Sequence, residues 1–179
     1  MTLKNKNKIN NMKFENNMEF KMINGQKTGI IPNLQYGFFS MGRNGCEIIS
    51  VYNALIYCKT PVPISEIAFI MEKYRLLFGL LGCNPFCFDK LNTVLGLNAI
   101  KIRNPKNTPA FIISFWCGIP FISSVHTVFC TAEENNHITV YNRYNQSKGA
   151  TTYNNFDDFI GNRKIISAYA IKKQIFCFN

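Results

Sequence analysis

The hydrophobic pattern of this chain changes its period near residue 98, and this change constrains the fold more than any other feature. Before it, apolar residues recur every three or four positions, which is typical of helices with one buried face. After it, alternating apolar and polar residues become common, which is typical of strands. Helices followed by strands predict an α+β fold with an antiparallel sheet, because a parallel sheet needs helices between its strands.

Capping residues, prolines and glycines set the expected boundaries of these elements. The predicted helical segments are a helix from about residue 45, capped by Asn44 with Glu47 at capping-box spacing, a helix over 64–74, a helix from Asn84-Pro85 to Gly96, a short helix over 109–117 and a helical turn over 154–159. The predicted strands cover about 98–103, 120–131, 137–142 and 165–171. The turn at 133–136 joins two of them as a hairpin.

The 179 residues are enough for one domain, and the hydrophobic content of 47% is enough for a buried core. The formal net charge is +10, and residues 1–27 hold six lysines against two glutamates among many asparagines. We therefore expect a polar, basic, flexible arm over 1–27 and a single domain over 28–179. The arm can contact polyanions weakly. No glycine loop for phosphates, zinc finger or aromatic RNA motif accompanies it, so no nucleic-acid function is expected.

The chain shows no sign of export or of membrane insertion. No stretch approaches about 18 apolar residues, so no membrane span is expected. No apolar segment of a signal peptide follows the first lysines, which favours a cytoplasmic protein. Seven cysteines, including Cys177, are an odd number and favour reduced thiols. Only Cys83 and Cys87 form a close pair, so no metal or other cofactor is expected.

Cys46 differs from the other cysteines in its local sequence. It follows Asn44-Gly45 and falls in the first turn of the predicted helix. The positive end of a helix stabilises a thiolate and lowers the pKa of a cysteine, and Gly45 leaves the backbone open to a substrate. These features predict a nucleophile. A small residue packed under the start of a helix is the alternative, which this local sequence leaves open.

Of the two histidines, His126 begins an apolar alternating run, whereas His137 follows the predicted turn. A histidine at the start of a strand is commonly a packed core residue. If the hairpin is centred on residues 134–135, however, Asn142 or Arg143 lies opposite His126, and one residue of slack in the loop makes Asn142 the direct partner. Facing side chains have Cβ atoms about 5 Å apart. The Asn142 side-chain carbonyl would then accept from one imidazole nitrogen and leave the other for a thiol. The pattern therefore predicts a Cys-His-Asn site.

The motif Asn44-Gly45-Cys46-Glu47 before an apolar helix resembles the nucleophile motif of papain-like cysteine peptidases. It is most similar to their bacterial branch related to the bacteriocin-leader-processing peptidases. Further similar motifs follow in the same order: a Ser-Glu helix at 64–67, Gly96-Leu97, the Gly-x-Pro-apolar strand at 118–122, His126, Val140-Tyr141-Asn142 and a Phe-x-x-Phe helix at 156–159. The resemblance covers about residues 33–172.

This resemblance implies a papain-like fold and a cysteine peptidase or amide hydrolase that acts on a peptide through a thiol acyl-enzyme. It implies Cys46 as the nucleophile, His126 as the general base and then acid, and Asn142 as the residue that orients His126. The family's oxyanion glutamine usually stands six residues before the cysteine, where this chain has Ser40. Gln35 is the nearest glutamine and is therefore the expected oxyanion donor.

Two other functions remain open on the same residues. A Cys-His acyltransferase uses the same acyl-enzyme and passes the acyl group to an amine instead of water, so it acts on a small acyl or peptide substrate. A catalytically inactive relative binds a peptide in the same cleft, and Ser40 in place of the usual glutamine supports this alternative. The sequence leaves the substrate, the acceptor and the oligomeric state open.

Overall fold

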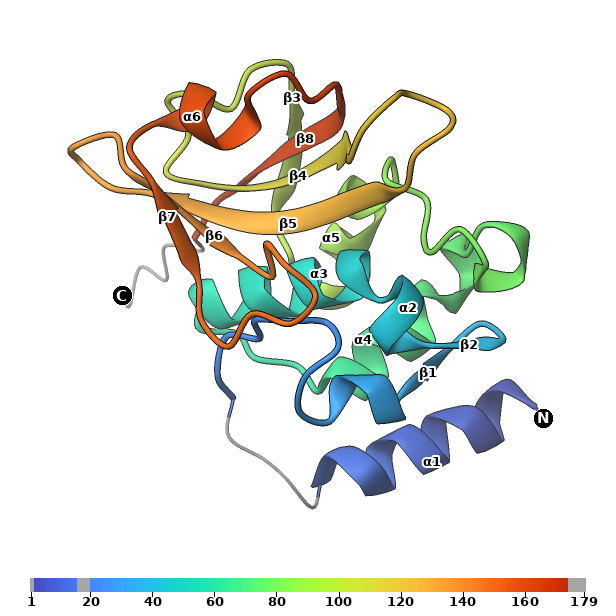
Figure 1. Ribbon diagram of the computed structural model, residues 1–179. Helices are drawn as coiled ribbons and strands as arrows, with labels where there is room; N and C mark the ends of the chain where they lie inside the picture. The colour runs from blue at the N-terminus through green and yellow to red at the C-terminus, as the bar shows by residue number, and fades with distance from the viewer. Residues whose placement is uncertain (1, 16–19, 174–179) are drawn as a thin grey trace, which may run out of the picture.

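The expected order of helices followed by an antiparallel sheet is confirmed in the computed structural model of the protein (Figure 1). The structure describes residues 2–15 and 20–173, except for the side chains of 12–15. The helices are α1 (Leu3–Glu15), α2 (Met41–Asn44), α3 (Cys46–Tyr57), α4 (Ile64–Met71), α5 (Asn92–Leu95) and α6 (Phe156–Ile160), with 3-10 turns at Ile31–Asn33, Glu72–Tyr74, Leu77–Gly79 and Phe88–Leu91. None of the helices in these ranges is long and apolar enough to cross a membrane.

The main sheet has six strands in the order β3-β8-β4-β5-β6-β7, and each neighbouring pair is antiparallel. These strands are β3 (Ala99–Ile102), β4 (Ala110–Trp116), β5 (Val125–Ala132), β6 (Ile138–Tyr141), β7 (Thr151–Tyr153) and β8 (Ile165–Ile171). A separate ribbon joins β1 (Gln35–Tyr36) to β2 (Phe39–Ser40) beside the helices. The order places β8 and β4 in the interior of the sheet, with β4 between β8 and β5.

The sheet is covered on both faces by apolar side chains. Ile112 and Phe129 belong to the larger core, which lies between the sheet and the helices α3 and α4. Phe111 and Ile113 belong to a second core on the opposite face, which α6 covers with Phe156 and other residues. Because successive side chains of a strand alternate between faces, β4 contributes to both cores along its whole length.

The prediction of a short helix over 109–117 is wrong, because this segment is the interior strand β4. All but the last of its residues are buried. A strand buried on both faces shows no alternation of apolar and polar residues, and the run Ala-Phe-Ile-Ile-Ser-Phe-Trp therefore has the same pattern as a buried helix.

The N-terminal segment is packed against the domain, where the sequence predicted a flexible arm over 1–27. Helix α1 lies against α4, and the Lys6 ammonium is buried 2.8 Å from Glu72 Oε1. Further along, the backbone N–H and carbonyl of Ile23 both bond to the side-chain amide of Asn53 in α3. Residues near 23 are therefore part of the domain, because α3 fixes their backbone directly.

Helix α3 begins at Cys46 as predicted, but Asn44 does not cap it. Asn44 is the last residue of α2, and its side chain donates to the carbonyls of Tyr36 and Gly79. Gly45 is the N-cap residue and provides no side-chain acceptor. The amide of Asn44 instead ties the β1–β2 ribbon to the loop before residue 80, so it fixes the segment that leads into Cys46.

Candidate active site

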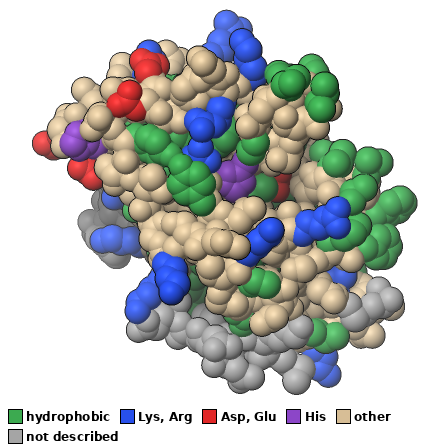
Figure 2. Space-filling model, viewed as in Figure 1, with side chains coloured by type: hydrophobic (Ala, Val, Ile, Leu, Met, Phe, Trp, Pro, Cys, Tyr) green, Lys and Arg blue, Asp and Glu red, His purple; other side chains and the backbone are tan. Residues whose placement is uncertain are grey.

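A pocket of about 330 Å³ opens where α3 and β5 both begin, and Cys46 and His126 line it together. Its walls also include Gln26, Arg43, Cys117 and Arg143. Figure 2 shows a hollow on this face that holds a histidine side chain and has Lys and Arg side chains around it. The fold therefore brings the first residue of α3 and the second residue of β5 to one cavity, although they are far apart in the sequence.

The Cys46 thiol is 7% exposed and lies 3.3 Å from Glu47 Oε2, to which it donates. The backbone N–H of Thr127, which follows His126 in β5, also donates to the Cys46 sulfur. Burial raises the pKa of Cys46 well above its ordinary value of 9, and the charge of Glu47 raises it further. The predicted lowering of this pKa is wrong, because burial and a neighbouring carboxylate outweigh the helix end.

His126 is held by the main chain of the loop after β6. Its Nε2 lies 2.7 Å from the backbone carbonyl oxygen of Asn142, which can only accept a hydrogen bond. Nε2 therefore carries the proton in the neutral ring, and Nδ1 is left unprotonated as a base. Burial lowers the pKa of His126 below 6.5, and the nearby charge of Arg143 lowers it further, which favours this neutral form.

Asn142 contacts His126 as predicted, but through its backbone rather than its side chain. The β5–β6 register pairs Phe129 with Tyr141 and Cys130 with Val140. Continued to His126, this register leads to residue 144, two residues beyond the expected partner Asn142. Asn142 follows the end of β6 with a φ of 59°, a left-handed conformation that asparagine tolerates better than most residues. Its side chain is buried and, within the described ranges, its amide has no hydrogen-bond partner.

Gln35 does not reach this pocket, which corrects its expected role as the oxyanion donor. It is exposed on β1, and its backbone bonds to the side chain of Asn10 in α1. Gln26 lines the Cys46 pocket instead, is 3% exposed, and makes no side-chain hydrogen bond within the part of the chain that the structure describes.

The turn that carries Gln26 is fixed by the loop after β6. The Lys27 N–H donates to the carbonyl of Asn145 at 2.7 Å, and the Asn142 N–H donates to Asn24 Oδ1 at 3.1 Å. Gly25 has a φ of 82° and approaches the carbonyl of Ser147 so closely that a Cβ there would lie 2.1 Å from its oxygen. Sequence spacing could not find Gln26, because only this long-range contact brings it to Cys46.

The other cysteines provide no metal site in the described part of the chain. The sulfurs of Cys83 and Cys87 lie 3.7 Å apart in the core, and no group of three or more His, Cys, Asp or Glu side chains in the described ranges could hold a metal ion. Cys117 is exposed at the pocket, whereas Cys58 and Cys130 are buried. Cys177 lies outside the described residues.

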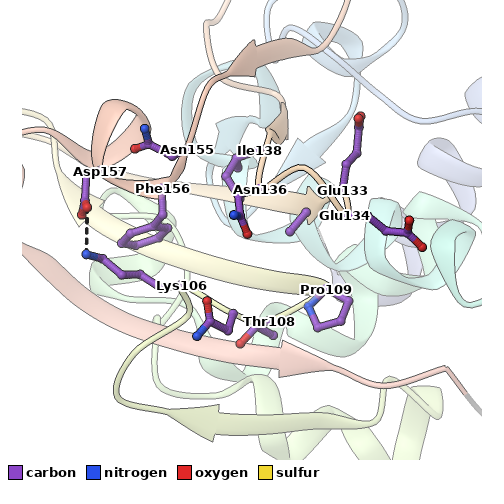
Figure 3. Close-up of a pocket in the computed structure, with 12 residues that line it drawn as sticks. Lys106, Thr108, Pro109, Glu133, Glu134, Asn136, Ile138, Asn155, Phe156 and Asp157 are labelled. Carbon is purple, nitrogen blue, oxygen red and sulfur yellow. Dashed lines mark hydrogen bonds and ion pairs between the residues drawn. The ribbon is translucent and has the colours of Figure 1, made fainter.

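A second pocket of about 460 Å³ lies at the opposite end of β4 and β5 (Figure 3). Pro109 and Ala132 line it, and Lys106 forms an ion pair of 2.8 Å with Asp157 at its edge. His126 and Ala132 are six positions apart on β5, which corresponds to roughly 20 Å. The described residues that line this pocket include no cysteine or histidine, so it lacks the thiol and imidazole that line the Cys46 pocket.

Comparisons with protein-family models, with curated proteins and with solved structures found no match.

Proposed function

We propose that the protein is a papain-like cysteine acyl hydrolase that cleaves an amide or thioester bond through an acyl-enzyme on Cys46. The observation that carries this proposal is the shared pocket of Cys46 and His126, in which the Asn142 carbonyl occupies Nε2 and leaves Nδ1 as a base. The topology supports it as well, since a helix begins at the cysteine and an antiparallel sheet carries the histidine.

In the proposed reaction, Cys46 attacks the substrate carbonyl while His126 Nδ1 takes the thiol proton. The high pKa of Cys46 and the low pKa of His126 mean that the resting pair is a neutral thiol and a neutral imidazole. The proton therefore moves as the bond forms, and no thiolate is stored beforehand. The imidazolium then protonates the leaving amine or thiol, and water attacks the thioester to release the acid and regenerate Cys46.

The side-chain amide of Gln26 and the backbone N–H of Cys46 are the proposed donors to the oxyanion. Replacing Gln26 with alanine should lower kcat by about a hundredfold, because one donor to the developing charge is lost. KM should change much less, since the ground-state carbonyl carries little charge. The measurement is steady-state kinetics with an activated acyl substrate.

Gln35→Ala is the matched control for this prediction, because Gln35 is exposed on β1 and away from the pocket. We expect it to keep the kcat of the unchanged protein. Equal kcat values for the Gln26→Ala and Gln35→Ala variants would remove Gln26 from the mechanism, provided that both proteins have the same melting temperature.

A non-catalytic, peptide-binding role is the second candidate, and two observations favour it. The Cys46 thiol donates to Glu47 in the free protein. In addition, side chains alternate along β5, so Thr127 and Phe129 face α3. His126 lies on the opposite face of the sheet, next to Phe115. For acyl transfer, the thiol must therefore turn from Glu47 toward the pocket when a substrate binds.

Trapping of the acyl-enzyme separates the two candidates. The protein is mixed with an N-acetylcysteamine thioester, quenched in acid and mapped by peptide mass spectrometry. We expect the acyl group on Cys46, no acylation at position 46 in Cys46→Ser, and much slower acylation in His126→Ala. Acyl groups on the exposed Cys117 alone would contradict the proposed function. Addition of glycinamide then identifies the acceptor, because an acyltransferase forms the amide and a hydrolase forms the free acid.

A further inference from the structure

Arg143 is a buried cation that faces the candidate active site without a carboxylate partner. It is 8% exposed and lines the pocket with Cys46 and His126. Its Nε donates to the Tyr153 hydroxyl at 3.1 Å, and its Cζ lies 4.6 Å from the centre of the Tyr144 ring. Within the described ranges, no Asp or Glu oxygen lies within 4.0 Å of its guanidinium nitrogens. Buried charges in proteins are usually paired, so the unpaired charge of Arg143 favours binding of an anion from a ligand.

The rest of the pocket has the same polarity. Arg43 also lines it and stacks on Phe39, with Cζ 4.9 Å from the ring centre. None of the described lining residues is acidic. The Glu47 carboxyl group lies 3.3 Å from the Cys46 sulfur, but Glu47 is only 2% exposed. Two guanidinium groups and no acidic side chain among the described lining residues of a concave site attract anions. The planar donors of arginine match the oxygens of a carboxylate or a phosphate.

The position of Arg143 relates this charge to the reacting groups. It directly follows Asn142, whose carbonyl holds His126. The Phe115 ring contacts both side chains, with its centre 6.1 Å from the His126 ring and 5.7 Å from Arg143 Cζ. An anion on Arg143 would therefore lie on the His126 side of the pocket, close to the bond that is cleaved.

We propose that this pocket selects acyl substrates that carry a carboxylate or a phosphate near the scissile carbonyl, and that this anionic group binds to the guanidinium of Arg143. The proposal rests on the acyl-transfer function proposed above, because that function places the scissile carbonyl between Cys46 and His126. Arg43, which is exposed at the rim, adds attraction for the same group.

Binding of small anions to the Cys46→Ser variant tests this directly, because this variant cannot form the acyl thioester. The α-carboxyl group of each probe is blocked as a primary amide, so that only the side chain can carry a charge. In this form N-acetylglutamate presents one carboxylate, N-acetyl-O-phosphoserine presents a phosphate, and N-acetylglutamine is the neutral control with the shape of the first. By calorimetry, we expect at least one anion to bind about tenfold or more tightly than N-acetylglutamine. The stronger of the two identifies the oxyanion that the site prefers. Equal affinities for all three compounds would overturn the proposal.

Replacement of Arg143 shows whether this side chain is responsible. Arg143→Gln, made in the Cys46→Ser protein, should abolish the preference for the anion, and Arg143→Lys should keep only part of it because the planar donors are lost. Arg103→Gln is the matched control, because Arg103 is exposed after β3 and its replacement changes the net charge equally. An anion preference that survives Arg143→Gln would overturn the proposal.

Salt dependence keeps the proposal testable if Arg143→Gln does not fold. Raising the NaCl concentration from about 0.05 M to about 0.5 M should weaken binding of the preferred anion to the Cys46→Ser protein and leave N-acetylglutamine unchanged. An anion affinity that is independent of salt would contradict an ionic contact with Arg143.

A failure of this proposal can be distinguished from a failure of the proposed function. Acylation of Cys46 by thioesters with no preference for anions would overturn the anion site and leave the acyl-transfer chemistry supported. Anion binding that depends on Arg143, without acylation of Cys46, would contradict acyl transfer and with it the statement that the anion belongs to a substrate of that reaction.

Discussion

Replacing Cys46 with serine should lower kcat/KM for thioester or amide cleavage by at least about a thousandfold, and His126→Ala should cause a loss of similar size. The two side chains act in one proton transfer, so removal of either one stops the same step. The kcat/KM of the double variant should therefore be about the same as that of the less active single variant. The measurement is kcat/KM for the four proteins with one activated thioester.

Two control variants test whether these losses are specific to the proposed pair. Cys117→Ser removes an exposed thiol from the same pocket, and His137→Ala removes the histidine of the β5–β6 turn. Both should keep most of the activity. If the loss of kcat/KM in the double variant equals the product of the two single losses, Cys46 and His126 do not act together in one step.

The pH profile gives the same prediction a second measurement. His126 must be neutral to accept the thiol proton, and burial together with Arg143 holds its pKa below 6.5. Activity should therefore rise with pH through this lowered pKa, and the acidic limb of kcat/KM should lie below pH 6.5. A midpoint above pH 6.5 would contradict the neutral resting state of the pair.

The second large effect concerns stability and arises from the buried carboxyl group of Glu47. Glu47 is 2% exposed, and Gly82 packs so closely against it that a Cβ on Gly82 would lie 3.0 Å from Glu47 Oε2. Burial raises its pKa from 4.5 to about 7. The folded protein therefore holds this proton more tightly than the unfolded chain does. The resulting stabilisation is complete below pH 4.5 and is lost as the pH rises to about 7.

The size of this effect follows from the rise in pKa. Each tenfold change in proton affinity corresponds to about 1.4 kcal/mol, so Glu47 should lower the free energy of unfolding by about 3 kcal/mol between pH 4.5 and pH 8. Glu47→Gln keeps the shape of the protonated group and should abolish this decrease. The variant should then be more stable than the unchanged protein at pH 8. Urea unfolding at pH 5 and pH 8 measures the difference.

Glu66→Gln is the matched control for the stability measurement, because Glu66 is exposed on α4. It should keep the decrease in stability between pH 5 and pH 8. If Glu47→Gln and Glu66→Gln show the same dependence on pH, the carboxyl group of Glu47 is not protonated in the folded protein.

Local patterns in the sequence predict most of the helical part and the strands β3, β5, β6 and β8, but not the short edge strand β7. Helix α3 has apolar residues at helical spacing, and β8 is an apolar run bounded by polar loops, so both are placed correctly. β4 is mistaken for a helix because its side chains are buried on both faces of the sheet. Such a strand has no polar face, and only its neighbours β5 and β8 define it.

The candidate site shows the same division between local and long-range information. Cys46 and His126 carry local signals, a helix start and a strand start, and both lie at the pocket. Gln26 carries no local signal, because a turn at residues 24–28 and a loop at 142–147 meet only in the folded chain. Asn142 is predicted to contact His126 through its side chain, whereas its backbone carbonyl makes the contact. The register differs by two residues from the expected pairing with His126, and the left-handed backbone of Asn142 follows the end of β6.

The hydrogen bond between Lys27 and Asn145 also sets the time at which the pocket can first exist. Ribosomal synthesis proceeds from the N-terminus, so Gln26 and Cys46 leave the ribosome long before the loop after β6 does. About 120 residues separate the two partners of this bond, and His126 lies between them. A nascent chain that ends before residue 142 therefore has Cys46 but lacks the carbonyl that orients His126 and the wall that holds Gln26. The site can therefore assemble only after the loop that follows β6 has left the ribosome.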